Sequence, residues 1–375
     1  MKIIADENID FLSETFAKHG ELIRMNGRNI PEFLTPGIDA LIVRSVTKIN
    51  SLPEKSNLKF VGTTTIGTDH INIDLLHKNG IYFSNAAGCN STAVAEWTIA
   101  AILNYICTNS LELNKIKLGI VGFGNIGKKV NLLAGKLGIQ TFVNDPPLQD
   151  EGFNFPFVTL ENLEECDIIT FHLPLTKSGK YPSYGLIDEN HTVLNSNVKL
   201  LINSSRGEII SIKTLKKFAE SGEKSVYLDV WEGEPVIDTY FLDYVELATP
   251  HIAGYTAEGK FNGTMMIYEQ FCNFFGFPQS DKLELPKMMV RFTRKDVPAL
   301  ENVSSLLSTI AHHKEDTEQL KKAKSLLQDD LGKYFDELRK NYLPRREWSN
   351  IILKSSDFNN NEIVILQTLG FNFED

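Results

Sequence analysis

The sequence predicts an α/β protein with two doubly wound, parallel-sheet domains and a smaller α+β domain after them. Three observations predict this class. Short apolar runs that indicate strands alternate with helical segments over residues 1–87, a second alternating series begins at residue 116, and the composition changes again after residue 281. Strands that alternate with helices form parallel sheets covered by helices on both faces.

The first series consists of short apolar runs bounded by turn residues. Helices are expected over residues 9–20, ending at Gly20, and over 73–80. Strands are expected at residues 1–7, 21–27, 38–45, 58–67 and 81–87. The segment STAVAEWTIAAILNYIC, residues 91–107, predicts a long helix that is apolar on most sides. We expect this helix to be buried between domains.

The second series begins with strand, helix and strand over residues 116–145. Later strand-like runs are rich in β-branched residues and short enough to be buried parallel strands. They lie at residues 166–173, 198–205, 225–230 and 244–250. A helix is expected over 256–277 and a strand over 287–294, and no repeat of the solenoid kind is visible.

Composition limits the class of function. The chain has 375 residues, 42% of them hydrophobic and 23% charged, which predicts a globular protein of two or three domains. Its net charge of −10 argues against binding to nucleic acid, which needs a basic face. The four cysteines form no C-x-x-C pair, so we expect no metal site and a reducing cytoplasm. No signal peptide and no membrane span are expected.

A glycine loop begins the second series. The sequence GIVGFGNIG follows a strand-like run and opens a helix, which is the context that a dinucleotide-binding loop requires. The first glycine allows a tight turn, the second lets the backbone approach a pyrophosphate, and the third lets helix and strand pack closely. The helix N-terminus offers N–H groups to the phosphates. Cofactor contacts are therefore expected at Gly122, Gly124, Asn125, Ile126 and Gly127.

Asp145 favours NAD as the cofactor. It ends the next strand-like run, where an acid can accept a hydrogen bond from the ribose 2′-hydroxyl. The same carboxylate would repel the 2′-phosphate of NADP. Without Asp145, the loop would indicate no more than an ordinary turn between strand and helix.

Three further strand ends should arrive at the edge marked by the glycine loop, and they carry Arg206, Glu234 and His251. A single histidine beside apolar residues is more often structural than catalytic, but this one coincides with two other charged residues and a cofactor loop. Oxidation of a hydroxyl-bearing carbon needs a base near neutral pH, which histidine provides. A carboxylate can orient the ring and stabilise its cation, and an arginine can bind a substrate carboxylate. The set predicts oxidation of a 2-hydroxy acid.

These residues carry a family resemblance. The chain resembles the D-isomer-specific 2-hydroxyacid dehydrogenases, with GFGNIG, CDIITFHLPLT, NSSRG, DVWEGEP and PHIAG in the order of that family. The resemblance implies that Arg206 and Glu234 are active-site residues and that His251 donates or accepts the proton. It also implies that Asp229 and Gly254 join Asp145 in contacting NAD, and that the substrate contacts are Ser45, Thr65 and Tyr255.

A closer resemblance lies within the family. The segments VRSVTKIN, FVGTTTIGTDHI, HIAGYTAEGK and LRKNYLPRREWS are similar to the branch that oxidises 4-phospho-D-erythronate with NAD in pyridoxal 5′-phosphate synthesis. This similarity implies a homodimer. It also implies a flavodoxin-like substrate domain over residues 1–92 completed by 254–280, a Rossmann domain over 93–253, and a C-terminal dimerisation domain over 281–375.

Two alternatives remain open at this point. One is another member of the family, such as a phosphoglycerate dehydrogenase or a general 2-hydroxyacid dehydrogenase. The other is a NAD-sensing binding protein on the same fold, which would not need Glu234 and His251 together. The sequence departs from its relatives at Leu173 and at Ser211, and neither change removes a proton carrier. For the substrate phosphate, the candidate ligands are Arg44, Arg345 and Arg346, each of which could instead form a structural ion pair.

Overall fold

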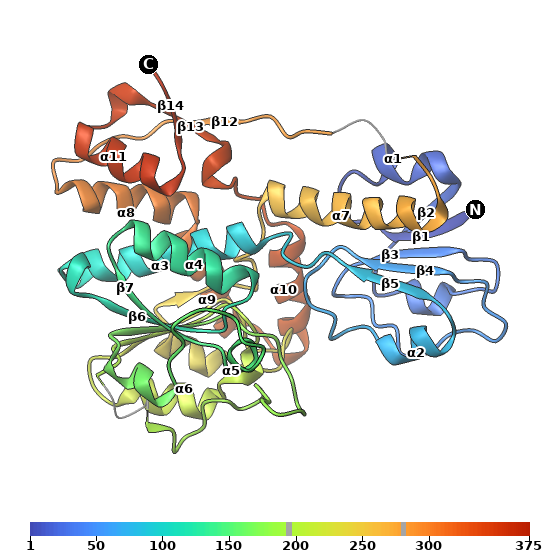
Figure 1. Cartoon of the computed structure of the whole chain (residues 1–375), viewed down its shortest axis with the longest axis horizontal. Coiled ribbons are helices and arrows are strands. Elements are labelled where there is room, and N and C mark those ends of the chain that lie inside the picture. The colour runs from blue at the N-terminus through green and yellow to red at the C-terminus, as the bar shows by residue number, and fades with distance from the viewer. Residues whose placement is uncertain (193–196, 279–282) are drawn as a thin grey trace. The chain divides into compact units, whose positions relative to one another are not determined.

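A computed structural model describes residues 1–192, 197–278 and 283–375, and it divides the chain into two compact units. The first unit comprises Met1–Asn90 with Thr256–Leu285, and the second comprises Ser91–Tyr255 with Pro286–Asp375. Each unit contains a parallel sheet with helices packed on it (Figure 1), so the predicted α/β class is confirmed. The finer division into three domains stays a prediction.

The sheet of the first unit is a five-stranded parallel sheet of order β2-β1-β3-β4-β5. Its strands are β1 (Lys2–Asp6), β2 (Glu21–Met25), β3 (Ala40–Val43), β4 (Phe60–Thr63) and β5 (Tyr82–Asn85). This is the flavodoxin-like order, in which ligands bind outside the carboxyl ends of the strands. Each strand lies within a run predicted from the sequence.

Helices from distant parts of the sequence cover this sheet. They are α1 (Leu12–Thr15), α2 (Ile73–Lys78) and α7 (Ala257–Phe275). Helix α7 packs closely on β4, because a Cβ atom at Gly62 would lie 2.4 Å from the Ile267 side chain. The helix expected over residues 9–20 is interrupted: Phe11 adopts φ 62°, so α1 begins only at Leu12 and is followed by a 3-10 turn. Phe16, between the two pieces, is fully buried.

The sheet of the second unit is parallel and six-stranded, of order β11-β10-β9-β8-β6-β7. Its strands are β6 (Lys117–Val121), β7 (Gln140–Asn144), β8 (Ile168–Phe171), β9 (Leu200–Asn203), β10 (Ser225–Leu228) and β11 (Leu247–Ala248). This is the order of a doubly wound sheet, in which the succession of strands changes direction between β6 and β8. Because every pairing is parallel, all six carboxyl ends lie at one edge.

Successive side chains along these strands enter different cores, as the period of a strand requires. Ile168 packs in a core with α3 (Ser91–Thr108) and α4 (Asn125–Lys136). Ile169, the next residue, packs in a core with α6 (Ile212–Glu220). The sheet is therefore doubly wound, and α5 (Pro146–Asp150) follows β7, the edge strand of the sheet.

Ser211 caps α6 by accepting a 3.2 Å hydrogen bond from the Thr214 amide, so serine performs the capping that an aspartate would provide.

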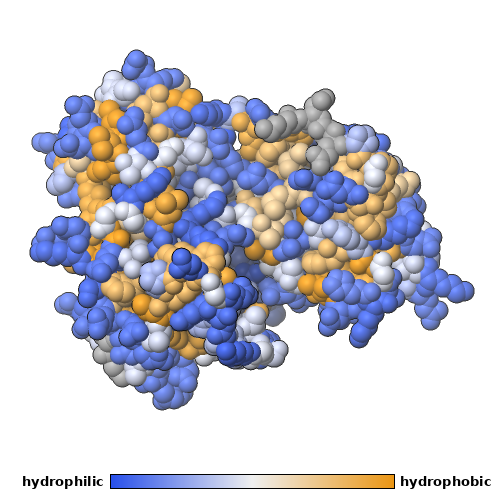
Figure 2. Space-filling view, viewed as in Figure 1, coloured by the Kyte–Doolittle hydropathy of each residue, from blue (hydrophilic) through white to orange (hydrophobic). Residues whose placement is uncertain are grey.

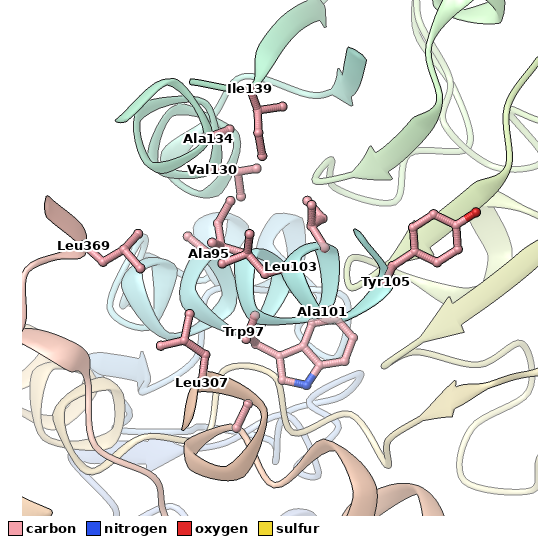
Figure 3. Close-up of a cluster of buried hydrophobic side chains, with 14 of the residues drawn as sticks. Ala95, Trp97, Ala101, Leu103, Tyr105, Val130, Ala134, Ile139, Leu307 and Leu369 are labelled. Carbon is pink, nitrogen blue, oxygen red and sulfur yellow. The ribbon is translucent and has the colours of Figure 1, made fainter. Parts of the chain in front are cut away.

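Helix α3 is buried on most sides, as its sequence predicts. Figure 3 shows Ala95, Trp97 and Leu103 on α3 between two sets of side chains. Val130 and Ala134 of α4 lie on one side, and Leu307 of α8 (Ala299–Ile310) and Leu369 of α11 (Asn360–Leu369) pack in the same core. Helix α3 therefore shares one hydrophobic core with the six-stranded sheet and with the C-terminal residues.

The C-terminal residues form a small α+β arrangement inside the second unit. Its parallel sheet has the order β12-β13-β14, with strands Met288–Val290, Ile351–Lys354 and Asn372–Glu374. Its helices are α8 (Ala299–Ile310), α9 (His313–Lys321), α10 (Gln328–Lys340) and α11 (Asn360–Leu369). Helix α9 protects the edge of the large sheet, because the Thr317 hydroxyl accepts a 3.1 Å hydrogen bond from the Ala248 amide.

Short 3-10 helices connect these elements. They span Ala17–His19, Ile30–Phe33, Leu113–Lys115, Glu161–Glu165, Gly207–Ile209, Thr239–Tyr244, Lys322–Ser325, Trp348–Asn350 and Ser355–Asp357. In the described part of the chain, no helix is long and apolar enough to cross a membrane. Figure 2 shows one face of the molecule, on which hydrophilic residues are widespread and hydrophobic residues lie in groups among them. No cluster that could hold a metal ion is found among residues 1–192, 197–278 and 283–375.

Candidate active site

The glycine loop has the geometry expected of a dinucleotide loop. Gly122 adopts φ 93°, and a Cβ atom there would lie 2.5 Å from the His172 carbonyl oxygen. A Cβ atom at Gly127 would lie 2.0 Å from the Gly122 carbonyl oxygen, so helix α4 can approach β6 only with glycine there. Gly124 borders open space, and α4 begins at the exposed Asn125. The first N–H groups of a helix have no partner inside it and favour an anion.

Asp145 lies beside this loop at the end of β7. Its Oδ2 atom accepts a 2.6 Å hydrogen bond from the Phe123 amide, and its Oδ1 atom caps α5 at 3.0 Å from the Leu148 amide. The carboxylate is therefore fixed between the glycine loop and the next helix. A carboxylate in this position can accept a further hydrogen bond from a ribose hydroxyl, since each oxygen has two lone pairs.

Glu234 and His251 are in direct contact. His251 Nδ1 lies 2.7 Å from Glu234 Oε2, and the Trp231 amide donates a 2.8 Å hydrogen bond to Glu234 Oε1. The His251 side chain is 31% exposed and the Glu234 side chain 20%. Burial opposes ionisation of Glu234, but the interactions with His251, Arg339 and the Trp231 amide outweigh it and lower the pKa of the carboxyl. The pair is thus an ionised carboxylate beside a reachable imidazole.

The segment that carries His251 is held by Asp229. Asp229 Oδ1 accepts hydrogen bonds from the Thr249 hydroxyl at 2.6 Å and the Ile252 amide at 2.7 Å, and Oδ2 accepts one from the Ala253 amide at 3.0 Å. His251 itself adopts φ 57°, a conformation that costs about 1–3 kcal/mol in a non-glycine residue. The bonds to Asp229 maintain this conformation. Burial raises the pKa of Asp229, although His251, Thr249 and the two amides oppose that effect.

Arg206 lies on the neighbouring strand end, after β9. The Asn203 side chain accepts hydrogen bonds from Ser205 and donates one of 2.9 Å to the Arg206 carbonyl oxygen, so the turn is closed. The next residue, Gly207, is so close to the chain at Trp231 that a Cβ atom would lie 2.0 Å from the Trp231 carbonyl carbon. This close packing joins the Arg206 turn to the segment that bears Glu234.

His172 shows what a structural histidine at the same sheet edge looks like. It is buried and lies 2.9 Å from the Thr170 hydroxyl and 3.5 Å from the Ser204 hydroxyl. Burial lowers the pKa of His172 to about 3. A histidine that stays neutral and enclosed cannot exchange protons with a substrate, so of the two histidines at this edge only His251 suits acid–base chemistry.

The predicted substrate contacts Ser45 and Thr65 belong to the first unit. Ser45 is exposed after β3, and Thr65 follows β4 with its hydroxyl 2.8 Å from that of Thr63. Because β3 and β4 are parallel neighbours, both residues lie at the same edge of that sheet. Arg44 is engaged in an ion pair, with its Nε atom 3.0 Å from the buried Asp6 carboxylate. The geometry therefore favours a structural role for Arg44 over binding of the substrate phosphate.

Gly254 and Tyr255 follow His251, and the residues on either side of Gly254 contact the C-terminal residues. The Arg345 amide donates a 3.2 Å hydrogen bond to the Tyr255 carbonyl oxygen, and the Arg345 guanidinium donates one of 2.5 Å to the Ala253 carbonyl oxygen. Arg345 is only 5% exposed. Arg346 donates to the Pro286 carbonyl oxygen at 2.5 Å. Both arginines hold backbone segments together, so a structural role is favoured over phosphate binding for each.

Sequence reasoning missed two contributions to this site. One is the role of Asp229 in holding the His251 segment. The other is Arg339 on α10, whose guanidinium lies 5.8 Å from the centre of the Tyr255 ring and whose charge acts on Glu234. The only signal for Arg339 was its place in LRKNYLPRREWS, which carried the closer resemblance without indicating a role.

Comparisons with known proteins agree with this geometry. The family model described as "D-isomer specific 2-hydroxyacid dehydrogenase, NAD binding domain" matches residues 94–253, and a family described as a domain of unknown function matches 286–370. A solved 3-phosphoglycerate dehydrogenase from Entamoeba histolytica, bound to NAD+, is 26% identical, with a TM-score of 0.60 over 74% of this chain and 95% of that one. The chain is an oxidoreductase with NAD as its cofactor.

Two curated relatives match over their whole length. The erythronate-4-phosphate dehydrogenase of Yersinia enterocolitica is 39% identical and is matched over 99% of each chain. The enzyme of the same name from Photorhabdus laumondii is 40% identical over 100% of each chain. The chain therefore belongs to the erythronate-4-phosphate dehydrogenase family, a branch of the NAD-dependent D-isomer-specific 2-hydroxyacid dehydrogenases.

Proposed function

We propose that this protein oxidises 4-phospho-D-erythronate to 3-hydroxy-2-oxo-4-phosphooxybutanoate in pyridoxal 5′-phosphate biosynthesis. The observation that carries the choice of substrate is the match, at 39–40% identity over essentially the whole chain, to enzymes named for it. The match includes the C-terminal residues, for which a general 2-hydroxyacid dehydrogenase has no evident need.

The 2.7 Å contact between Glu234 and His251 supports the proposed chemistry. Because Nδ1 faces Glu234, Nε2 is the ring nitrogen that accepts the proton of the substrate 2-hydroxyl. Glu234 fixes the ring orientation and stabilises the imidazolium that forms. Bound NAD supplies the acceptor for the hydride that leaves the same carbon. Arg206 binds the substrate carboxylate as a fork of N–H donors.

Cofactor contacts are proposed along the glycine loop and at three positions beyond it. The pyrophosphate would be held by Gly122, Gly124, Asn125, Ile126 and Gly127, and the ribose by Asp145. The further contacts are Asp229 and Gly254. Substrate contacts are proposed at Ser45, Thr65 and Tyr255, each of which lies at or after a strand end.

We also propose the finer organisation implied by the resemblance. A substrate domain over residues 1–92 and 254–280 and a Rossmann domain over 93–253 would be joined to a dimerisation domain over 281–375. Met288 and Met289, 46% and 52% exposed on β12, support a homodimer because they offer an apolar surface to a second copy. Free cysteines, several of them buried, support a cytoplasmic location. Sedimentation analysis of the full chain tests the dimer, and a single species of monomer mass contradicts it.

The proposed substrate is tested by measuring NADH formation by the purified protein. The competing substrates are 4-phospho-D-erythronate, unphosphorylated erythronate and 3-phosphoglycerate, with hydrazine present to trap the keto acid. We expect kcat/KM to be greatest for 4-phospho-D-erythronate, and to exceed that for unphosphorylated erythronate by about 100-fold or more, since a site built for a phosphate leaves unpaired donors without it. A higher kcat/KM for 3-phosphoglycerate, or no NADH from any of the three, contradicts the proposal.

A further inference from the structure

Helix α10, in the C-terminal residues, is packed against the segment that follows Glu234 (Figure 1 labels α10). A Cβ atom at Gly332 would lie 3.3 Å from Val236 and 3.4 Å from Pro235, so the helix and this segment are in close contact. Phe335, one turn later, is buried in the same core as Trp231, which holds Glu234 through its amide. The position of α10 is therefore fixed relative to Glu234.

Arg339 extends from the same face of α10 as Gly332, two turns further along. The carbon of its guanidinium lies 5.8 Å from the centre of the Tyr255 ring, so the cation lies over the face of that ring. Its Nε atom is buried, with no hydrogen-bond partner among the described residues. A buried donor atom without a partner is costly in a purely structural role, because burial removes its hydration without compensation.

The charge of Arg339 acts on the acid–base pair. The pKa of Arg339 is raised although burial opposes this, because Tyr255 and Glu234 favour its charged form. In the other direction, Arg339 helps to lower the pKa of Glu234. The other titratable groups around these residues are Asp336 on α10, Tyr255, and Asp229, whose charge interacts with His251.

We propose that Arg339 is a positioning residue for the oxidation: from α10 it supplies a positive charge that acts on Glu234 beside His251, and it holds the ring of Tyr255, which follows His251 in the chain. The inference rests on the proposed function, because it assigns to Glu234 and His251 the proton transfer described there. It gives the C-terminal residues, which a family model described as a domain of unknown function matches, a direct part in the active site.

The test compares the full-length protein with Arg339→Met, Arg339→Lys and Lys340→Met. Methionine keeps much of the aliphatic length without the charge, lysine keeps the charge, and Lys340 is the exposed next residue of the same helix. We expect Arg339→Met to lower kcat roughly 10- to 100-fold, a part of the usual contribution of general acid–base catalysis, with KM changed less than about 3-fold. The low-pH limb of the rate should move to higher pH, because loss of a neighbouring cation favours protonation of Glu234.

Arg339→Lys should have a pH profile close to that of the unmodified protein, because lysine keeps the charge. Lys340→Met should behave as the unmodified protein. Unchanged kcat and pH profile in Arg339→Met overturn the proposal. So does an increase of KM for 4-phospho-D-erythronate alone, because that result makes Arg339 a ligand of the phosphate.

A second readout does not depend on the substrate. In protein labelled with 13C-glutamate, the Glu234 carboxyl resonance, assigned through Glu234→Gln, should titrate at higher pH in Arg339→Met than in the unmodified protein, because Arg339 helps to lower the pKa of this carboxyl. An unchanged titration overturns the inference even if 4-phospho-D-erythronate is oxidised. A shifted titration in a protein that does not oxidise 4-phospho-D-erythronate keeps the link between Arg339 and the pair and rejects only the substrate.

Discussion

Replacement of Asp229 by asparagine tests how the His251 segment is held. Asp229 Oδ1 accepts two hydrogen bonds, from the Thr249 hydroxyl and the Ile252 amide, whereas Oδ2 accepts one, from the Ala253 amide. An asparagine would keep its oxygen at the position with two donors. Its NH2 group would then face the Ala253 amide, which leaves two donors in contact.

The expected cost follows from these contacts. One charge-assisted hydrogen bond, worth about 1.5–3 kcal/mol, is lost, and a buried N–H is left without a partner at about 1–3 kcal/mol. Allowing for partial relaxation, we expect the free energy of local opening to fall by about 2–4 kcal/mol. At about 1.36 kcal/mol for each factor of ten, the opening equilibrium rises roughly 30- to 1,000-fold.

Native-state hydrogen exchange of the Ile252 and Ala253 amides measures this opening directly. The matched control is Asp243→Asn, because Asp243 is 62% exposed and forms an ion pair with Lys324. We expect faster exchange of these two amides in Asp229→Asn and unchanged exchange in the control. Protection of both amides within threefold of the unmodified protein would refute the reasoning.

Three further predictions concern the site and its surroundings. Glu234→Gln should move the low-pH limb of oxidation to lower pH, because the imidazolium loses its carboxylate partner; a coincident pH–rate profile contradicts the pairing. Asp145→Ala should weaken NAD binding by about 10-fold and reduce the preference over NADP, as measured by titration with both cofactors; equal affinity of the unmodified protein for NAD and NADP contradicts this role. Burial raises the pKa of Asp316 to about 7. Between about pH 4 and pH 7 the folded state therefore holds a proton that the unfolded state has released, so stability falls as pH rises through this range. Asp316→Asn should therefore raise the thermal midpoint at pH 8 but not at pH 4, and parallel curves against pH would contradict the assignment.

Much of the architecture could be predicted because buried parallel strands are short apolar runs between turn residues. The runs at 38–45 and 58–67 contain β3 (Ala40–Val43) and β4 (Phe60–Thr63), with only their ends too long. Pairing with neighbours sets where a strand ends, and a single sequence does not contain that information. The helix expected over residues 9–20 is wrong for a similar reason: burial of Phe16 in the sheet core accompanies a break that helical periodicity does not reveal.

The contact between Glu234 and His251 could be expected because both residues follow adjacent parallel strands. A position at a strand end does not by itself separate His251 from His172, since both have one. Their surroundings separate them: His172 is buried and neutral, whereas His251 is partly exposed beside a carboxylate.

Contributions from distant parts of the sequence could not be predicted. Arg339 reaches Tyr255 only because α10 packs on the residues after Glu234, and nothing local to either segment specifies that contact. Arg345 was a candidate ligand of the phosphate because it is charged and follows a proline. In the folded chain Arg345 is buried, and its guanidinium donates a hydrogen bond to the Ala253 carbonyl oxygen.

The central claim is that His251 accepts the substrate proton while Glu234 supports it. The most direct measurement is the single-turnover rate of NADH formation from 4-phospho-D-erythronate in His251→Ala, with NAD affinity determined separately by titration. The account predicts a rate about 10²- to 10⁴-fold lower than that of the unmodified protein, the range for loss of a general base, with NAD affinity unchanged. A rate within about threefold of the unmodified protein, at full NAD occupancy, would contradict the account.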